Sequence, residues 1–251
     1  MKLTYIFHSG FALEAENCIL VFDYWLDPSN VADKFLRSGK ALYVFASHFH
    51  EDHFNKEVLT WRRRHSNITY IFSKDIYRRR RASKEEADVW LAKGGVWSEE
   101  NVSVIATGSN DSGVSWIVDV DGQRVFHAGD LNNWYARLLN ERYELNKAIL
   151  NEMGMSVDPM VEERVFLGEL KDISKETKRF DLVMFPIDGR IGNGYTRGAR
   201  QFIDIFEVKY FVPMHFVTCG YASAHRMKEY TDAKGIIFWS IGDVGEVLDI
   251  R

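Results

Sequence analysis

Short apolar runs rich in β-branched and aromatic residues recur along the whole chain and alternate with longer, charged, amphipathic stretches. Such runs are typical of β-strands, whereas apolar positions spaced three and four residues apart are typical of surface helices. We therefore predict strands at Leu3–His8, Cys18–Asp23, Leu42–Ser47, Ile68–Phe72, Val102–Ala106, Val114–Val120, Arg124–Ala128, Leu182–Ile187, Tyr210–Met214, Ile236–Trp239 and Glu246–Ile250. Helices are predicted at Val31–Arg37, Lys56–Arg64, Lys84–Lys93, Trp134–Glu152, Met160–Lys175, Ala199–Glu207 and Ser223–Thr231.

The order of these elements favours mixed sheets over a purely parallel one. Asp121-Gly122 separates two predicted strands by a tight turn, which indicates a hairpin, whereas other strands are separated by helices. Hairpins together with strand–helix–strand units indicate an α/β protein whose sheets are covered by helices. Two successive helical stretches, within residues 134–175, interrupt this rhythm, and we expect them to form a helical cap over one end of the sheets.

Composition narrows the class of protein. The 251 residues are 46% hydrophobic, with four dispersed prolines and no linker, so we expect a single domain over residues 1–251. The net charge of −4 argues against a nucleic-acid binder, because such domains are usually strongly basic. The absence of a long apolar run argues against a membrane partner. With two cysteines and no apolar leader, the expectation is a cytoplasmic protein.

The segment that carries chemistry follows the predicted strand Leu42–Ser47. It contains His48, His50, Asp52 and His53, a pattern whose chance occurrence in a chain of this composition is about 0.0006. Imidazole and carboxylate groups are the ligands that zinc and related divalent metals prefer. A polar turn with exposed histidines is the alternative, and the rarity of the spacing favours a metal site, with room for two ions side by side.

Two later strands end in further ligand types. Asp130 follows a predicted strand after His127-Ala128-Gly129, and His215 follows the strand that ends at Met214. Taken alone, a histidine after a strand is more often a hydrogen-bonded core residue than a ligand. Their order after the first motif makes them candidate ligands.

These residues together resemble the metallo-β-lactamase superfamily. The resemblance includes Asp23 at a strand end and spans nearly the whole chain. Segments 8–11 and 127–134 most resemble bacterial metal-dependent hydrolases that are related to ascorbate-6-phosphate lactonase. It implies an αββα four-layer sandwich of two mixed β-sheets flanked by helices. It also implies a dinuclear metal-dependent hydrolase that uses a metal-bound hydroxide.

The resemblance further implies a role for each residue. His48 and His50 would bind one metal, Asp130 would bridge both, and Asp52, His53 and His215 would bind the other; Asp23 would support the loop, and His8 would lie near the site. The hydroxide would be oriented by Asp52 or Asp130. The leaving group would receive a proton from His127 or His8, although each of these two histidines is equally consistent with a structural role.

One family ligand is missing from this chain. The family has a further histidine between the first motif and the bridging aspartate, where this chain has Ser109-Asn110-Asp111. We hypothesise that Asp111 replaces it, with a simple turn as the alternative. An oxygen ligand would favour manganese or iron relative to zinc, so the expected cofactors are two divalent metal ions of open identity.

Three other residues are candidates for contact with the substrate or the ligands. Asp188 follows the strand Leu182–Ile187 in a glycine-flanked turn, and Asn132 and Trp134 follow Asp130. The alternatives are a helix-capping aspartate and a core tryptophan.

The function we expect is hydrolysis of a small-molecule ester, lactone or phosphate-bearing compound. The alternatives are a non-catalytic member that binds metal or ligand and, less favoured, a ribonuclease or phosphodiesterase. The arginines of residues 62–64 and 78–81 precede acidic residues, which indicates a solvated face rather than a nucleic-acid site. The sequence leaves the possibility of a homo-oligomer open.

Overall fold

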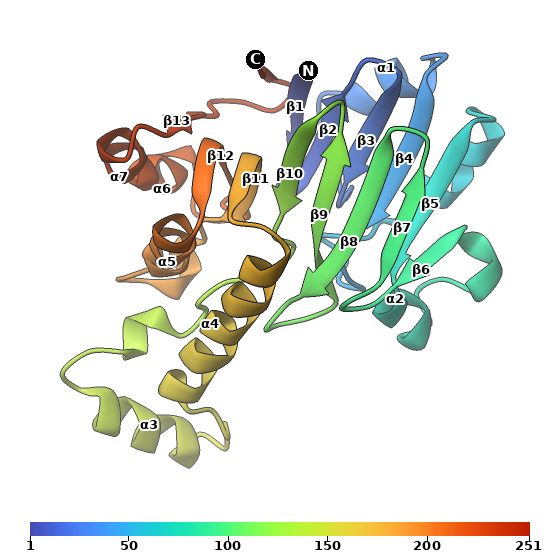
Figure 1. The fold of residues 1–251 in the computed structure, drawn as a ribbon. Helices are drawn as coiled ribbons and strands as arrows, with labels where there is room; N and C mark the ends of the chain where they lie inside the picture. The colour runs from blue at the N-terminus through green and yellow to red at the C-terminus, as the bar shows by residue number, and fades with distance from the viewer.

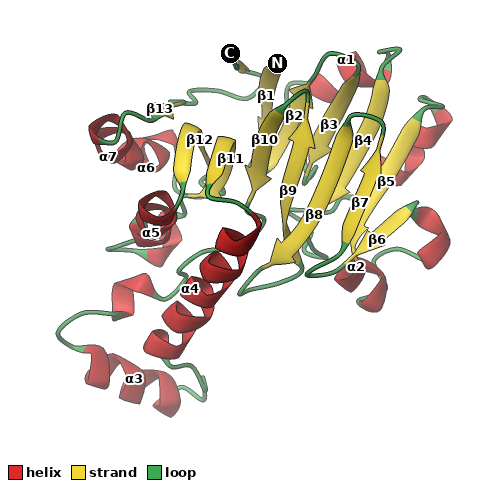
Figure 2. Cartoon of the chain, in the orientation of Figure 1, coloured by secondary structure: helices red, strands yellow, loops and turns green.

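Two seven-stranded β-sheets form the centre of the molecule in the computed structural model, which describes residues 1–251. Figures 1 and 2 show the sheets facing each other, with helices on the outside. The first sheet has the order β14 (Val247–Asp249), β1 (Lys2–Phe7), β2 (Gly10–Glu14), β3 (Cys18–Phe22), β4 (Ala41–Ala46), β5 (Ile68–Ser73) and β6 (Val89–Leu91). The second has the order β13 (Ile237–Phe238), β12 (Glu207–Met214), β11 (Arg179–Pro186), β10 (Gln123–His127), β9 (Val114–Val120), β8 (Val102–Gly108) and β7 (Val96–Glu99).

Helices and 3₁₀ segments cover both outer faces. Those that follow strands of the first sheet are α1 (Val31–Leu36), η1 (Lys56–Arg63), α2 (Lys74–Arg78) and η2 (Lys84–Glu86). The others are η3 (Ala136–Leu138), α3 (Tyr143–Glu152), α4 (Pro159–Glu176), η4 (Gly189–Ile191), α5 (Arg197–Ile205), α6 (Tyr221–Ala224), η5 (His225–Met227) and α7 (Lys228–Ala233). The predicted four-layer αββα sandwich is therefore confirmed. No helix is long and apolar enough to cross a membrane.

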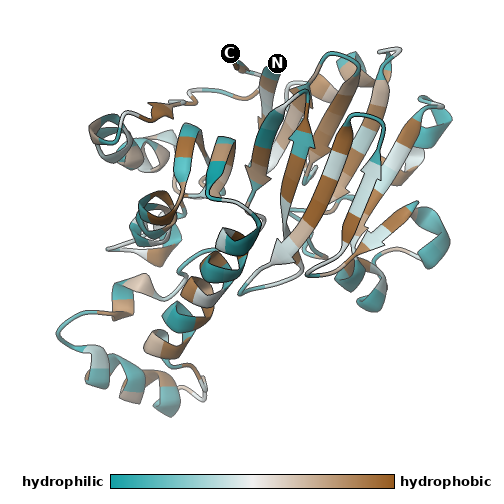
Figure 3. Cartoon of the chain, in the orientation of Figure 1, coloured by the Kyte–Doolittle hydropathy of each residue, from teal (hydrophilic) through white to brown (hydrophobic).

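Two hydrophobic clusters hold the layers together. The larger one contains 49 buried residues and joins the facing sides of both sheets to α4 and α5, through side chains such as Phe166 and Phe202. The smaller one contains 19 buried residues and packs α1, η1 and α2 on the outer face of the first sheet, around Phe35 and Trp61. Figure 3 shows the corresponding concentration of hydrophobic positions, in brown, along the strands.

The strand directions bring the candidate ligands to one edge of the sandwich. In the first sheet β1, β3 and β4 run parallel, because β2 pairs antiparallel with both β1 and β3 and β3 pairs parallel with β4. In the second sheet β8, β10, β11 and β12 run parallel, because β9 pairs antiparallel with both β8 and β10, and β11 pairs parallel with both β10 and β12. The carboxyl ends of parallel strands lie at the same edge of their sheet, and every candidate ligand follows one of these strands or, in the case of Asp111, lies in the turn after β8.

Several sequence predictions of elements were wrong. Strands β2, β6 and β7 were not predicted, since β2 lacks alternation and β6 has only three residues. The predicted helix Lys84–Lys93 is a short 3₁₀ segment followed by β6, because pairing of β6 with β5 outweighs the local helical pattern. The predicted helix Trp134–Glu152 is helical only from Tyr143, after η3.

The stretch 134–175 divides into two unlike parts. Helix α4 buries Phe166, Leu170 and Ile173 in the larger cluster and so belongs to the helix layer. Helix α3 buries no residue and extends away from the sheets in Figure 1.

Candidate metal centre

Six of the predicted ligands converge at the edge where the parallel strands end. His48, His50, Asp52 and His53 lie in the loop after β4, Asp130 follows β10, and His215 follows β12. Their ligand atoms form two neighbouring groups, His48–His50–Asp130 and Asp52–His53–His215, the second of which also includes His8; a third group, Asp23–His48–His53, shares two of these imidazoles. All the atoms within each group lie within 4.8 Å of one another.

The Asp130 carboxylate lies between these groups. Its Oδ2 atom is 3.2 Å from Nε2 of His48, whereas its Oδ1 atom is 3.0 Å from Nε2 of His53 and 3.4 Å from Nε2 of His215. His48 Nε2 is in turn 3.0 Å from Nδ1 of His50. The two oxygens of one carboxylate therefore face two different sets of imidazole nitrogens.

Hydrogen bonds behind the site fix which nitrogen of each imidazole faces it. Nδ1 of His48 contacts Oγ of Ser47 at 2.9 Å, Nδ1 of His53 contacts Asp23 at 2.7 Å, and Nδ1 of His215 contacts Asp188 at 2.9 Å. Their Nε2 atoms are left to face the site. This is the arrangement by which partners of a ligating histidine set its tautomer and ring orientation.

Asp23 supports both the backbone of the loop after β4 and one of its imidazoles. It is fully buried, and its Oδ1 accepts a hydrogen bond from the Ser47 backbone N–H at 2.7 Å, while its Oδ2 accepts from the Ser47 hydroxyl at 2.6 Å. Burial opposes its ionisation, yet the imidazoles of His127 and His53 keep its pKa below the usual value. Asp23 thus ties the metal-binding loop to the end of β3.

The backbone is strained where these residues leave their strands. His8, Asp23 and His215 all have positive φ values, of 56°, 43° and 62°, in a region that non-glycine residues seldom occupy. Gly129 also has a positive φ, of 53°, and an added Cβ there would lie 2.8 Å from the carbonyl oxygen of Val114. Strain of this kind persists only where the surrounding structure enforces it, and it is common at functional sites.

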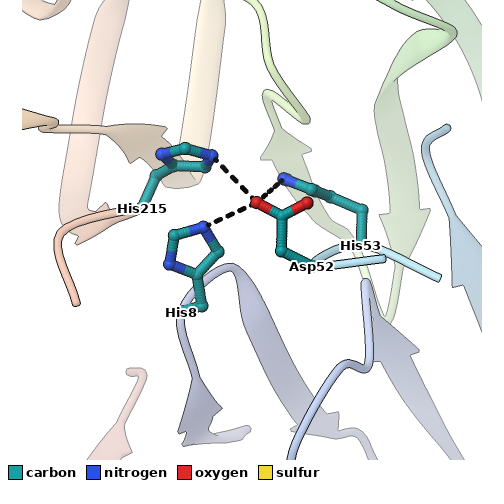
Figure 4. Close-up of side chains that lie close together, drawn as sticks. All are labelled: His8, Asp52, His53 and His215. Carbon is teal, nitrogen blue, oxygen red and sulfur yellow. Dashed lines mark ion pairs between the residues drawn. The ribbon is translucent and has the colours of Figure 1, made fainter. Parts of the chain in front are cut away.

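His8 lies among the ligands, as Figure 4 shows. Its Nε2 is 3.3 Å from Oδ2 of Asp52, and its ring centroid is 4.1 Å from that of His215. Burial, only partly offset by Asp52, lowers the pKa of His8 to about 4. The prediction that His8 lies near the site agrees with this placement.

The electrostatics of the centre favour ionised carboxylates. Burial opposes charge on Asp130, but the imidazoles of His53 and His48 lower its pKa well below the usual value. The same attraction raises the pKa of His53, against the effect of burial. For Asp52, the contact with His8 and the charge of His53 outweigh burial and lower its pKa.

Two other predicted residues, Asp111 and Asn132, lie outside the ligand groups. Asp111 lies on an exposed turn, outside the two ligand groups. Partial desolvation and the neighbouring Asp130 raise the pKa of its carboxyl, which is therefore within electrostatic reach of the site. The side chain of Asn110 makes two hydrogen bonds to the backbone of Asn132, donating from Nδ2 to its carbonyl oxygen and accepting its N–H at Oδ1, and so ties this turn to the loop that carries Asp130. Asn132 is thus a buried loop support.

His127 is placed behind the ligands. Its ring stacks on Phe22, its Nε2 is 2.9 Å from the carbonyl oxygen of Ser9, and its Nδ1 accepts from the Gly129 N–H at 3.2 Å. Both nitrogens therefore have backbone partners, and the geometry gives no support to His127 as a proton donor to substrate.

The structure adds residues that the sequence did not single out. Arg190 lies across Asp188, with its Nε 2.8 Å from Oδ2 of that carboxylate, and so completes a chain of contacts from solvent to His215. Trp134, which the sequence did single out, donates its indole N–H to the carbonyl of Asp130 and lies edge-on to His215. Of the missed residues, Ser47 adjoined the motif and Arg190 followed Asp188 by two positions, but nothing in the sequence indicated their partners.

The donors present fit metal ions. Nε2 of His53 and Oδ1 of Asp130 are buried and, although 3.0 Å apart, neither forms a hydrogen bond of acceptable geometry. Buried polar atoms without partners are costly, so their convergence calls for an additional bonded group. Imidazole with carboxylate is the ligand set of zinc, manganese and iron sites.

Comparison with known proteins agrees with this geometry. Residues 2–142 match the family described as the Beta-lactamase superfamily domain. A UPF0173 metal-dependent hydrolase of Korarchaeum cryptofilum is 26% identical over 185 residues, which cover 70% of this chain and 80% of that protein.

Solved structures show the same fold. Igni18, a metallo hydrolase of Ignicoccus hospitalis, superposes with a TM-score of 0.65 at 18% identity, covering 98% of this chain and 97% of that one. The metallo-β-lactamase fold protein YhfI of Bacillus subtilis gives a TM-score of 0.62 at 13% identity, with 98% of both chains covered. From the family match, the shared fold and the ligand arrangement, we conclude that the chain belongs to the metallo-β-lactamase superfamily.

Proposed function

We propose that the chain is a dinuclear metal-dependent hydrolase that acts on a small-molecule ester, lactone or phosphate-bearing substrate. The observation that supports this most is the position of Asp130, whose two oxygens face separate groups of imidazoles. A carboxylate so placed can bridge two cations. His48 and His50 would hold one of them, and Asp52, His53 and His215 the other.

When bound, the metals would lower the pKa of water from about 15.7 toward about 7, supplying hydroxide at neutral pH, and would polarise the bond under attack. The overall reaction adds water across that bond, leaving an acid and an alcohol. The protein's own contribution is orientation: Asp23, Ser47 and Asp188 fix the imidazoles through their Nδ1 atoms.

Asp52 and His8 are the residues we assign to the handling of protons. The side chain of Asp52 is 31% exposed, so its carboxylate is open to solvent. Its Oδ2 lies between the Nε2 atoms of His8 and His215, at 3.3 and 3.7 Å. Asp52 can therefore accept a hydrogen bond from the attacking water, and His8 can hold a proton beside it.

Asp111 is our candidate for the missing ligand of the first metal position. Its turn is held to the Asp130 loop through Asn110. Its carboxyl is near enough to His48 and His50 for both imidazoles to act on its pKa, in the direction opposite to burial. With this oxygen ligand, manganese or iron becomes more competitive with zinc.

The first experiment measures metal content by mass spectrometry on protein purified without a chelating tag. We expect about two ions per chain in the unaltered protein and about one in Asp111→Ala. Glu51→Gln is the matched control, because Glu51 lies within the motif but its side chain is 80% exposed and outside both groups. One ion or none in the unaltered protein would contradict the dinuclear proposal.

The second experiment tests hydrolysis. The metal-loaded protein is assayed with p-nitrophenyl acetate, γ-butyrolactone and p-nitrophenyl phosphate, before and after chelation. We expect at least one substrate to be cleaved in a metal-dependent manner, with activity retained in Glu51→Gln and lost in Asp130→Asn. Activity that survives both chelation and Asp130→Asn would rule out this centre as its source.

A further inference from the structure

A cavity of about 510 Å³ adjoins the metal centre. Its walls come from α3, from η3 with the tryptophan that precedes it, and from the loop after β11. Its volume falls within the range of about 300–1,000 Å³ that is typical of small-molecule sites. Figure 1 shows α3 standing apart from the sheets on the side of α4 and α5.

Three of the residues that line the cavity connect it to the centre. Trp134 has its ring centroid 5.4 Å from that of His215, and Asp188 contacts Nδ1 of the same histidine. Arg190 lines the cavity and is bonded to Asp188. A molecule in the cavity would therefore be separated from a predicted metal ligand, His215, by a single layer of side chains.

The wall formed by α3 is largely apolar. Helix α3 buries none of its residues, yet Ile149, Leu150 and Met153 on it line the cavity. Ile149 is 45% exposed and Met153 is 69% exposed. Exposed apolar side chains that gather around a concave surface commonly mark a ligand site.

The cavity also contains one unpaired cation. Arg190 is neutralised by Asp188, whereas Arg137, which lines the same cavity, forms no ion pair with any aspartate or glutamate. A guanidinium without a partner is suited to bind a carboxylate or phosphate.

We propose that this cavity binds the apolar portion of the substrate and that Arg137 pairs with an anionic group carried by that portion. This inference rests on the proposed hydrolase function and defines its substrate class: amphiphilic anions with an alkyl or aryl group, whose scissile bond lies beside His215. Helix α3 and Arg137 determine specificity and take no part in the chemical step.

Binding is tested by calorimetry on the metal-loaded protein with hexanoate, octanoate and decanoate. Burial of each methylene group on α3 is expected to tighten binding about three- to fourfold, so octanoate should bind about tenfold more tightly than hexanoate. We expect Ile149→Asn to weaken octanoate binding about tenfold. Affinities that do not change with chain length would overturn the proposal.

Leu145→Asn is the matched control for the helix. Leu145 lies on α3 with 56% of its surface exposed but does not line the cavity, so octanoate binding should be unchanged. Equal weakening by Leu145→Asn and Ile149→Asn would show a general loss of α3 and contradict a specific site. Far-ultraviolet circular dichroism of each variant reports whether the helix is kept.

A charge control distinguishes binding of the carboxylate by Arg137 from binding of the carboxylate by the metals. Arg137→Gln should weaken octanoate about fivefold or more and leave binding of uncharged 1-octanol unchanged. An octanoate affinity unaffected by Arg137→Gln would contradict the role given to this residue.

The two proposals fail in different ways. If the carboxylate series binds as expected while no ester, lactone or phosphate of the assay is hydrolysed, the hydrolase proposal fails and the cavity remains a ligand site. If p-nitrophenyl acetate and p-nitrophenyl octanoate are cleaved at equal kcat/KM, with no effect of Ile149→Asn, the cavity proposal fails and the hydrolase proposal stands.

Discussion

The metal centre and the wall of α3 lie side by side but are built in opposite ways. At the centre, His53 and Asp23 are completely buried, and hydrogen bonds to Nδ1 hold the imidazoles of His48, His53 and His215 from behind. On α3, no residue is buried and the apolar side chains contact a cavity instead of a core. Under the proposed function, the chemistry would depend on residues held firmly in place, whereas substrate selection would depend on residues that can be exchanged at little cost to the fold.

The largest expected effect of a single change is at Asp130. Asp130→Asn removes the negative charge that faces both groups of imidazoles, and we expect kcat/KM to fall by at least about 10³-fold. Steady-state kinetics on the substrate found in the hydrolysis assay measure this loss. A fall of less than about tenfold would show that the two groups do not act as one centre.

Metal removal should destabilise the whole protein. Ions present at about 1,000 times their dissociation constant stabilise the native state by about 4 kcal/mol. For a chain of this length, that corresponds to a decrease in Tm of about 8–16 °C after chelation. Differential scanning calorimetry with and without chelator checks this, and restoration of Tm by added metal controls for damage.

Two apolar residues of adjacent helices should respond unequally to truncation. Phe166 in α4 is fully buried, so Phe166→Ala is expected to lower the free energy of unfolding by about 3–5 kcal/mol. Ile149→Ala in α3 is expected to change it by less than about 0.5 kcal/mol. Denaturant unfolding of both variants measures the difference, and similar losses would mean that α3 is part of the core.

A smaller effect than that of Phe166→Ala is expected where Asp23 supports the ligands. Asp23→Asn leaves the shape of the side chain nearly unchanged but removes the charge that orients His53, and we expect metal affinity to fall about 10- to 100-fold. Competition with a chromogenic chelator measures the affinity. An unchanged affinity would show that the backbone alone holds the loop.

The sequence predicted the centre better than its surroundings for a physical reason. The spacing of His48, His50, Asp52 and His53 places four ligand types in one loop, so their proximity follows from the chain itself. Asp130 and His215 needed only the added expectation that the strands before them end at the same edge. The fold class could be predicted for a similar reason, since long strands such as β9 have a clear local signal.

Features that depend on pairing across the fold could not be predicted. The contact of Asp188 with His215 joins residues 27 positions apart and exists only because β11 and β12 are neighbours. The three-residue strand β6 is formed by its pairing with β5 and has no pattern of its own. The position of His127 behind the ligands followed from its stacking on Phe22, which no local motif encodes.

The span of the chain that supplies the centre has a consequence for folding kinetics. The cluster of His8, Asp52, His53 and His215 joins the first strand to the twelfth, so it cannot exist before both sheets have formed and docked. Contacts between residues so distant in sequence are closed late, because the entropy of a long loop must be overcome first. Metal uptake during refolding should therefore coincide with the slowest folding phase. The rate of metal binding would then report the rate at which the two sheets dock.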